Sequence, residues 1–461
     1  MDKLTIWQQN VNKSHLCQHD IISNKRLVTK GINLIALQEP ALNRDGLTIA
    51  SRDWTVIYPT THADNPRKSR SITLIRADLE SENWSQLEFP SSDVTVMQIT
   101  GTWGKLTIFN IYNDGEREDT LNLLTDYHRR HINALESAAA GEAHILWVGD
   151  FNRHHPLWDR PEDSRLFTND ATEAAEKLIE AITDIGLELA LPCGVPTHEH
   201  SVTKRWSRLD QVFISSHSNN LLTACRTLPE QRGINTDHLP IITELGLGIT
   251  TTEAKDIPNF RNANWEDLRD ELQKQLLKAT KPARITNQAQ LDEHCDDLTL
   301  ALQEAIRVAV PTDEITPKSK RWWTKELSHL RAHANKLGRT AYNLRGDPEH
   351  RIHRDHKAAK NKYRNAIKAT KQQHWRDWLE KAEDPDIWAA HRIVSAPHTD
   401  GGKAKVPKLK HKVGDEELTA GTNIEKSQAL ANCFFPAKPQ DQGGHAEAKY
   451  PKACKGVGKI T

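Results

Sequence analysis

Carboxylates, amides and a histidine stand at the ends of apolar runs in the first half of the chain. The run Ile145–Val148 leads through a glycine to Asp150 and Asn152. Catalytic residues gather where rigid strands meet loops, because the strands hold them in place. Oxygen ligands suit a hard divalent cation, and an aspartate beside a histidine suits proton transfer. The set comprises Asn10, Glu39, Tyr112, Asp150, Asn152, Asp210, Asp237 and His238.

The order of these residues carries more weight than any one of them. Taken alone, a QEP or GDFN sequence is more often a turn than a site. Here each polar residue lies at the edge of an apolar run. Alternation along a strand predicts that Asp150 and Asn152 point to one face and Phe151 points into the core. His154 and His155 follow, and we expect a DNA-facing or structural role for them in preference to metal binding.

Apolar runs of strand type recur along residues 1–248, and they must position this set. They are rich in Val, Ile, Thr and aromatic residues, with turn residues between them. Apolar residues at helical spacing predict helices over 118–139 and 170–186. Many strands with few helices favour a layered α/β sandwich. The predicted strands are 4–10, 32–40, 55–59, 71–77, 94–100, 105–113, 144–152, 208–215 and 240–249.

The second half of the chain has a different pattern, in which strand signals disappear. Helical spacing predicts helices over 265–279, 291–310, 324–344 and 348–382. Charge also changes: residues 1–317 hold 32 basic and 46 acidic residues, whereas 318–381 hold 18 and 6. We therefore expect four regions. They are an α/β domain over 1–248, a linker with acidic helices over 249–317, a basic helical region over 318–395 and a largely disordered tail over 396–461.

Bulk properties exclude several classes of protein. No apolar run approaches the ~20 residues of a membrane span, and the first residues lack a signal-peptide pattern. The six cysteines are scattered without CxxC pairs, which favours reduced thiols over a disulfide framework or a cysteine zinc site. We expect an intracellular, nuclear protein with no membrane partner.

Six motifs in order give a resemblance to a known family. They are QQNVN, LQEP, IYN, GDFN, RLD and TDHLP, and they span about residues 1–248. The sequence resembles the endonuclease/exonuclease/phosphatase superfamily, which includes DNase I and the apurinic/apyrimidinic endonucleases. It is most similar to endonuclease domains of non-LTR retrotransposons. The resemblance implies a four-layer α/β sandwich of two mainly antiparallel sheets flanked by helices. The basic helical region resembles the linker that precedes reverse transcriptase in such elements, and we expect that domain to be missing.

The resemblance also implies roles for the strand-end residues. Phosphodiester hydrolysis needs charge stabilised on the phosphate oxygens, which Mg²⁺ (or Mn²⁺) provides. His238 would contact the scissile phosphate with Asp210 behind it, and Asp150 would align or deprotonate the attacking water. The implied metal ligands are Glu39, Asn10 and Asp237, and the implied catalytic residues are Tyr112, Asp150, Asn152, Asp210 and His238.

The substrate is harder to predict, because residues 1–245 carry 24 basic and 33 acidic residues. Nucleic-acid binders usually show a basic footprint, so positive charge must be local. Two short segments are candidates, although each could equally be a solvated turn. The candidate DNA-binding residues are Arg67, Lys68, Arg70, Lys204, Arg205, Trp206 and Arg208. Residues 318–381 are a candidate for binding element RNA, or a solvated helical hairpin with packed tryptophans.

Three functions remain open. The first is a Mg²⁺-dependent endonuclease that nicks DNA for target-primed reverse transcription. The second is a phosphatase or phosphodiesterase of the same fold that acts on a lipid or small-molecule phosphoester, for which release of inorganic phosphate would be diagnostic. The third is an inactive relic that binds nucleic acid, although the intact set of strand-end residues argues against a decayed site.

Overall fold

The computed structural model describes most of the chain. The described residues are 3–23, 31–49, 53–137, 141–249, 258, 260, 263–278, 286–311, 322–380, 409–413, 416–420 and 423–434. They fall into two units, residues 1–404 and residues 405–461.

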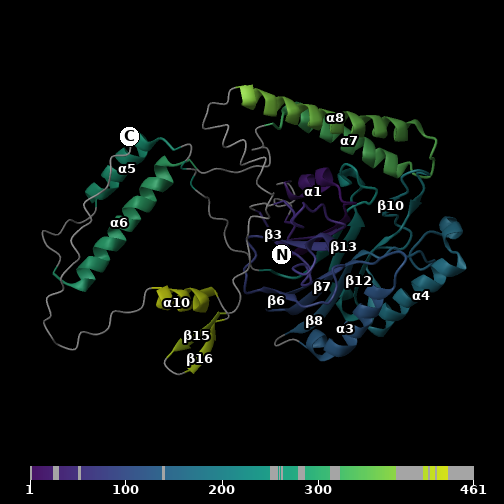
Figure 1. Ribbon diagram of the computed structural model, residues 1–461, viewed down its shortest axis with the longest axis horizontal. Helices are drawn as coiled ribbons and strands as arrows, with labels where there is room; N and C mark the ends of the chain where they lie inside the picture. Colours follow the sequence, from purple (N-terminus) through teal and green to yellow (C-terminus); the bar gives the residue numbers. More distant parts are fainter. Residues whose placement is uncertain are drawn as a thin grey trace. The chain divides into compact units, whose positions relative to one another are not determined.

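Two six-stranded sheets form the centre of the first unit (Figure 1). In each sheet one central pair is parallel, β1–β2 and β7–β8, and the other pairs are antiparallel. The first sheet has the order β13 (Leu222–Thr227), β14 (Ile241–Leu245), β1 (Leu4–Asn10), β2 (Leu34–Gln38), β4 (Ser71–Arg76) and β3 (Trp54–Ile57). The second has the order β5 (Trp84–Leu87), β6 (Val94–Gly101), β7 (Gly104–Tyr112), β8 (Glu142–Asp150), β12 (Asp210–Ser215) and β9 (Leu187–Leu189).

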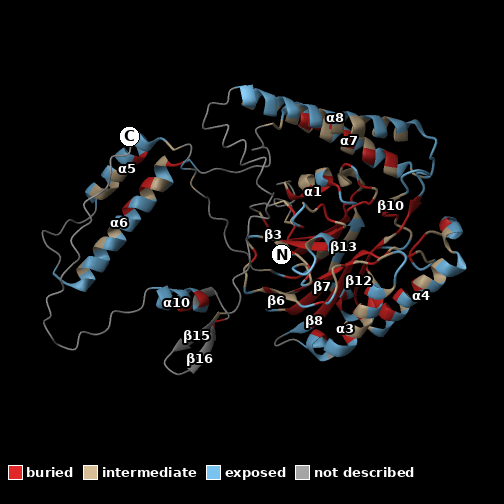
Figure 2. Cartoon of the chain, viewed as in Figure 1, coloured by how far each residue is buried: buried red, intermediate tan, exposed pale blue. Residues whose placement is uncertain are grey.

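Helices cover the outer face of each sheet, so the architecture has four layers. Apolar residues on the inner faces, such as Ile6 and Leu146, pack together between the sheets. The opposite face of β1 places Trp7 against α1 (His15–Ile22). Helices α3 (Asp119–Glu136) and α4 (Asn169–Asp184) cover the outer face of the second sheet. Figure 2 shows the central strands buried and the outer helix faces exposed. The predicted four-layer sandwich is confirmed.

Three strands of the sheets escaped sequence prediction, β5, β9 and β13. Only Trp84 of β5 and Leu187 of β9 are buried, and none of the six residues of β13 is. All three lie at sheet edges, where one side of the strand has no neighbour to pair with. Edge strands therefore tolerate polar residues and lose the apolar run that identifies a central strand.

The predicted helices of the second half are confirmed. They are α5 (Trp265–Lys278), α6 (Gln288–Ala309), α7 (Lys325–Asn343) and α8 (Arg351–Glu380). Helices α5 and α6 pack on each other through Leu268, Ala305 and Val310. Within the described residues, none of the helices combines the length and apolar character that crossing a membrane requires.

Helices α7 and α8 form a hairpin that contacts the sandwich. Leu327, Tyr363 and Ile367 form a buried cluster with Ile234, which lies between β13 and β14. The guanidinium of Arg331 lies 3.0 Å from a carboxylate oxygen of Asp20 on α1. Apolar burial and this ion pair hold the hairpin on the sandwich, so the full chain is the appropriate protein for functional tests.

The second unit contains a hairpin of β15 (Leu409–Val413) and β16 (Glu416–Ala420), followed by α10 (Asn423–Phe434). These elements lie within the segment 396–461, for which the sequence predicts a largely disordered tail. The segments 396–408 and 435–461 lie outside the described residues.

Candidate active site

Three strand ends converge on Asp150, the last residue of β8. In the sheet register, Asp150 lies opposite Tyr112 on one side and Asp210 on the other. The amide nitrogen of Asn10, at the end of β1, donates to Asp150 Oδ2 at 2.8 Å. The Asp150 carboxylate is 1% exposed. The sequence prediction that these strand ends meet therefore agrees with the structure.

The glycine that precedes Asp150 permits a close approach between neighbouring strands. A Cβ atom at Gly149 would lie 1.9 Å from the Ile111 carbonyl oxygen. The Gly149 carbonyl accepts a hydrogen bond of 2.8 Å from Gln8 Nε2 of the other sheet. Gly149 thus ties the two sheets together directly behind the carboxylate.

His238 lies between three carboxylates. Its Nδ1 is 2.9 Å from Asp210 Oδ2, so Asp210 fixes the orientation of the ring. Its Nε2 lies 3.8 Å from Asp150 Oδ2 and 3.9 Å from Asp237 Oδ1. The imidazole is buried, with 7% of its side chain exposed. This arrangement leaves Nε2 facing the carboxylates of Asp150 and Asp237.

Burial and charge act in opposite directions on these groups. Burial raises the pKa of Asp150, while the nearby His238 opposes that rise. Burial alone would lower the pKa of His238, but the carboxylates of Asp210 and Asp150 raise it above the ordinary value. At neutral pH the pair therefore holds a proton in a buried site, which suits general acid–base chemistry.

Glu39 follows β2 with a left-handed backbone, φ +45°. Its Oε2 accepts a hydrogen bond of 3.3 Å from Asn10 Nδ2, the nitrogen that also contacts Asp150. Asn10 Oδ1 accepts from the backbone nitrogen of Asn12 at 2.8 Å. The amide of Asn10 thus turns its nitrogen to the carboxylates. This geometry favours a bridging role for Asn10 over the predicted role as an oxygen ligand to a metal.

Tyr112, which stands opposite Asp150 in the sheet register, contacts Arg70. The guanidinium of Arg70 lies 4.7 Å from the Tyr112 ring centre and pairs with Asp93 and Asp114 at 2.6 Å. Burial, with the carboxylates of Glu39 and Asp150, raises the pKa of the Tyr112 phenol. The phenol therefore stays protonated and can donate a hydrogen bond.

The backbone conformation of Asn152 differs from the strand conformation that the sequence predicts. Strand β8 ends at Asp150, and Asn152 has a left-handed φ of +50°, so strand alternation does not apply to it. Its Nδ2 donates to the Asn113 carbonyl at 2.8 Å, and its backbone nitrogen donates to Asp150 Oδ1 at 3.1 Å. Asn152 thus braces Asp150 from the turn, while Phe151 is buried in the core as predicted.

A pocket of about 780 Å³ begins at Glu39 and contains the predicted basic segment of residues 67–70. Arg70 is fixed by its two ion pairs, and Arg67 Nε donates to the Arg44 carbonyl at 2.6 Å. The lining holds the basic residues Lys13, Arg67, Lys68, Arg70 and Arg117 and the acidic residues Glu39, Asp93, Asp114 and Asp119. Asp93 and Asp114 are paired with Arg70, so anionic groups that enter the pocket meet the other cations near Glu39.

The second predicted basic segment divides into exposed and buried residues. Lys204 and Arg205 are exposed. Trp206 is only 8% exposed, and its ring packs against Tyr342 at 5.3 Å. Arg208 is 1% exposed. Both side chains are buried in this structure, which argues against the direct DNA contacts predicted for Trp206 and Arg208.

Arg208 instead supports the core. Its guanidinium donates to the carbonyls of Leu191 at 2.9 Å and Pro192 at 2.6 Å, and its Nε donates to Gln211 Oε1 at 2.9 Å. We expect Arg208→Met to lower the free energy of unfolding by at least about 2 kcal/mol, because it leaves these acceptors unpaired. Arg205→Met, from the same segment, should change it by less than about 0.5 kcal/mol. Urea denaturation of both variants measures this, and equal effects would contradict the core role of Arg208.

His154 and His155 lie apart from the His238 group. His154 Nδ1 contacts Asp159 Oδ2 at 3.2 Å, and His155 Nδ1 accepts from the Leu157 backbone nitrogen at 3.2 Å. Neither belongs to a group of potential metal ligands among the described residues. These contacts are consistent with the structural role expected for them.

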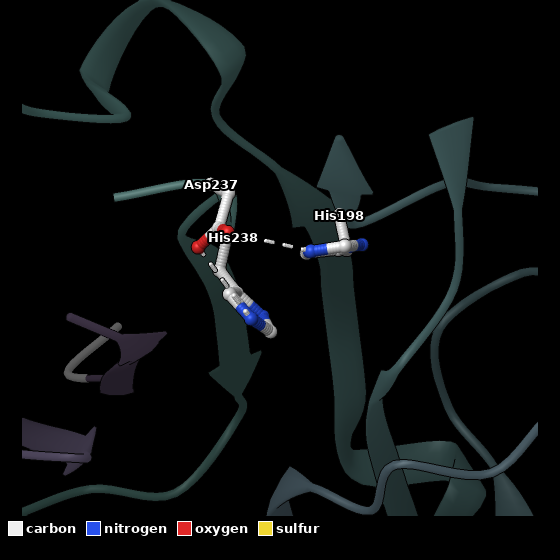
Figure 3. A group of neighbouring side chains, drawn as sticks. All are labelled: His198, Asp237 and His238. Carbon is white, nitrogen blue, oxygen red and sulfur yellow. Dashed lines mark ion pairs between the residues drawn. The ribbon is translucent and has the colours of Figure 1, made fainter. Parts of the chain in front are cut away.

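His198 was not identified from the sequence. It lies in β10 (His198–Glu199) and forms an isolated bridge with His238. Its Nε2 is 3.6 Å from Asp237 Oδ2, and its ring centre is 4.8 Å from that of His238 (Figure 3). The protonated forms of His198 and His238 hold the pKa of Asp237 below its usual range, although burial opposes this. Forty residues separate the two histidines, and no motif signalled their proximity.

Comparison with known proteins gives one family match and several similar folds. Residues 106–242 match the family model described as endonuclease-reverse transcriptase. The structure is similar to the endonuclease domain of TRAS1, a telomere-specific non-LTR retrotransposon (16% identity, 53% of this chain and 99% of that chain, TM-score 0.42). It is also similar to the AP endonuclease LMAP from Leishmania major (14%, 53% and 88%, TM-score 0.43). No curated protein matches the chain.

The segment that matches the family model contains six of the eight strand-end residues. They are Tyr112, Asp150, Asn152, Asp210, Asp237 and His238. The other two, Asn10 and Glu39, lie outside the match. The predicted resemblance to the DNase I-like endonuclease/exonuclease/phosphatase superfamily is confirmed over this part of the chain.

Proposed function

We propose that the chain is a divalent-metal-dependent phosphodiesterase that nicks DNA, as the endonuclease portion of a non-LTR retrotransposon polyprotein. The observation that carries the proposal is the buried group of Asp150, Asp210 and His238, in which Asp210 holds His238 at 2.9 Å. The pocket at Glu39, whose lining includes Lys68 and Arg117, supports an anionic substrate.

The residues present fit a hard cation. Glu39 and Asp237 both offer carboxylate oxygens, and their side chains are 20% and 24% exposed. Mg²⁺ prefers one or two carboxylates and keeps several waters, and each of these carboxylates is open enough to leave room for water. A bound cation would stabilise negative charge on the phosphate oxygens. Glu39 is the first ligand in this proposal, and Asp237 is the second or acts through water.

The remaining residues accept or donate protons, or hold other side chains in position. Asp150 takes a proton from the attacking water, because its raised pKa makes it a stronger base than an exposed aspartate. Protonated His238 donates through Nε2 to a phosphate oxygen while Asp210 holds its other nitrogen. Tyr112 donates to the leaving oxygen from the other side of Asp150. Asn10 and Asn152 keep the Asp150 carboxylate in place through their hydrogen bonds.

The DNA backbone would enter along the pocket at Glu39. Lys68 and Arg117 lie on its lining, and both can neutralise phosphates. Lys204 and Arg205 are exposed and remain candidates for contacts beyond the pocket. Phosphate contacts of this kind position the duplex without reading its sequence.

We also propose that the helical hairpin binds nucleic acid, including RNA of the element. Three lysines of α8, Lys357, Lys362 and Lys368, are exposed. Its tryptophans Trp375 and Trp378 stack on each other at 5.2 Å, so they do not pack singly between helices. Salt-dependent binding of single-stranded RNA, reduced in a triple Lys→Gln variant, would support this role.

A comparison of substrate classes tests the proposed nuclease. The full chain would be incubated with Mg²⁺ and either supercoiled plasmid or a phosphoinositide. We expect open-circular plasmid and no inorganic phosphate from the lipid. Phosphate release from the lipid without plasmid nicking would replace the proposal with a lipid phosphatase, and activity on neither would favour a binding relic.

A further inference from the structure

His198, Asp237 and His238 turn three potential metal ligands toward one another (Figure 3). We propose that they form a zinc site, which shares Asp237 with the proposed cation site at Glu39 and whose occupation inhibits the nuclease. The inhibitory part of this inference rests on the proposed function. The three ligand atoms all lie within 4.8 Å of one another.

The ligand types favour zinc over magnesium. Two imidazole nitrogens and one carboxylate oxygen are a ligand set typical of zinc, whereas Mg²⁺ takes oxygen ligands. Zinc–ligand bonds of about 2.0–2.1 Å place neighbouring ligands of a tetrahedral site roughly 3.3 Å apart. Asp237 Oδ2 lies 3.6 Å from His198 Nε2, and Asp237 Oδ1 lies 3.9 Å from His238 Nε2. All ligand atoms lie within 4.8 Å of one another, so side-chain shifts of about 1.5 Å or less bring them to this spacing.

Each histidine is held by a hydrogen-bond partner on its other nitrogen. Nδ1 of His198 lies 3.3 Å from Ser207 Oγ on the adjacent strand β11 (Trp206–Ser207). Nδ1 of His238 lies 2.9 Å from Asp210. Such partners orient metal-binding imidazoles and raise their affinity. Both Nε2 atoms therefore face Asp237 before a metal arrives.

The site is also accessible. The side chains of His198 and Asp237 are 14% and 24% exposed, so an ion can reach them without unfolding. The metal would hold three protein ligands and one open position for water.

Zinc binding and phosphodiester hydrolysis compete for one atom. The proposed mechanism requires a proton on His238 Nε2, and zinc requires the lone pair of that same nitrogen. Binding therefore releases the proton and removes the donor for the phosphate oxygen. A zinc-loaded protein should be unable to nick even when the Glu39 site holds Mg²⁺.

The test measures zinc binding and nicking separately on the full chain. Binding is measured by competition with a chromogenic chelator, and nicking at saturating Mg²⁺ is measured against zinc concentration. His198→Gln keeps a polar side chain and removes one ligand. The matched control is His154→Gln, which removes a histidine that contacts Asp159 at 3.2 Å and does not belong to this group.

We expect His198→Gln to weaken zinc binding at least about 10-fold and to raise the inhibitory zinc concentration by a similar factor, as loss of a supporting metal contact does. The control should change neither. Inhibition that is equal in wild type and His198→Gln would overturn the proposal, since zinc would then act elsewhere, for example at Glu39.

The two readouts also separate this inference from the proposed function. His198-dependent zinc binding by a protein that nicks no DNA would support the metal site and contradict the nuclease. Zinc-insensitive nicking by a protein that binds no zinc would support the nuclease and overturn the metal site.

Discussion

Substitution of His238 by asparagine is expected to slow plasmid nicking by about 100- to 10,000-fold, the range that general acid–base groups contribute. Asparagine can still contact Asp210, so the 2.9 Å interaction that anchors position 238 has a replacement. It cannot carry the positive charge that Asp210 and Asp150 stabilise on the imidazole. The loss should therefore appear in kcat with little change in KM, because the charge acts on the transition state.

His154→Asn is the matched control for this prediction. His154 also contacts an aspartate, Asp159, at 3.2 Å, and is partly buried. Its loss should leave nicking within about twofold of wild type. Nicking by His238→Asn at the wild-type rate, with the control also active, would remove His238 from the chemistry.

Substitution of Glu39 by glutamine should make nicking depend on far more Mg²⁺. The change keeps the shape of the side chain and removes the charge of the first proposed ligand. A metal ion supplies several kcal/mol of charge stabilisation, so at low Mg²⁺ we expect a rate loss of at least about 100-fold. Part of the activity should return at high Mg²⁺, because Asp237 and water remain. Rates measured across a Mg²⁺ series test this.

Glu142→Gln provides the control for a lost surface carboxylate. Glu142 is exposed at the start of β8, the opposite end of that strand from Asp150. Nicking by the Glu142→Gln variant should depend on Mg²⁺ in the same way as nicking by the wild type. A Glu39→Gln protein with an unchanged Mg²⁺ requirement would place the cation at another group, such as Asp150 or Asp237.

The central strands and the residues at their ends were predictable from the sequence. Strand β8 is buried along almost its whole length, and its apolar run Ile145–Val148 is followed directly by Gly149 and Asp150. Polar residues at those ends, such as Asp150 and Asp210, are consequently visible as interruptions. Asp150 and Asp210 stand opposite each other in the register of β8 and β12, so they lie close together once the two strands pair.

Side-chain partners within loops were not predictable. The segment TKRWSR reads as basic and exposed, yet Arg208 points into the core because three acceptors there require a donor. Asn152 leaves the strand because the chain turns immediately after Asp150. The meeting of His198 and His238 depends on an isolated bridge between distant segments, which leaves no periodic pattern in the sequence.

The most direct test of the account is nicking of supercoiled plasmid by the full chain, alongside Asp150→Asn, with saturating Mg²⁺ and with excess EDTA. The account predicts open circles from the wild type only with Mg²⁺, and a rate at least about 100-fold lower for Asp150→Asn, which removes the proposed base. Nicking that persists in EDTA, or that Asp150→Asn leaves undiminished, would contradict the claim that this buried group and its cation cut DNA.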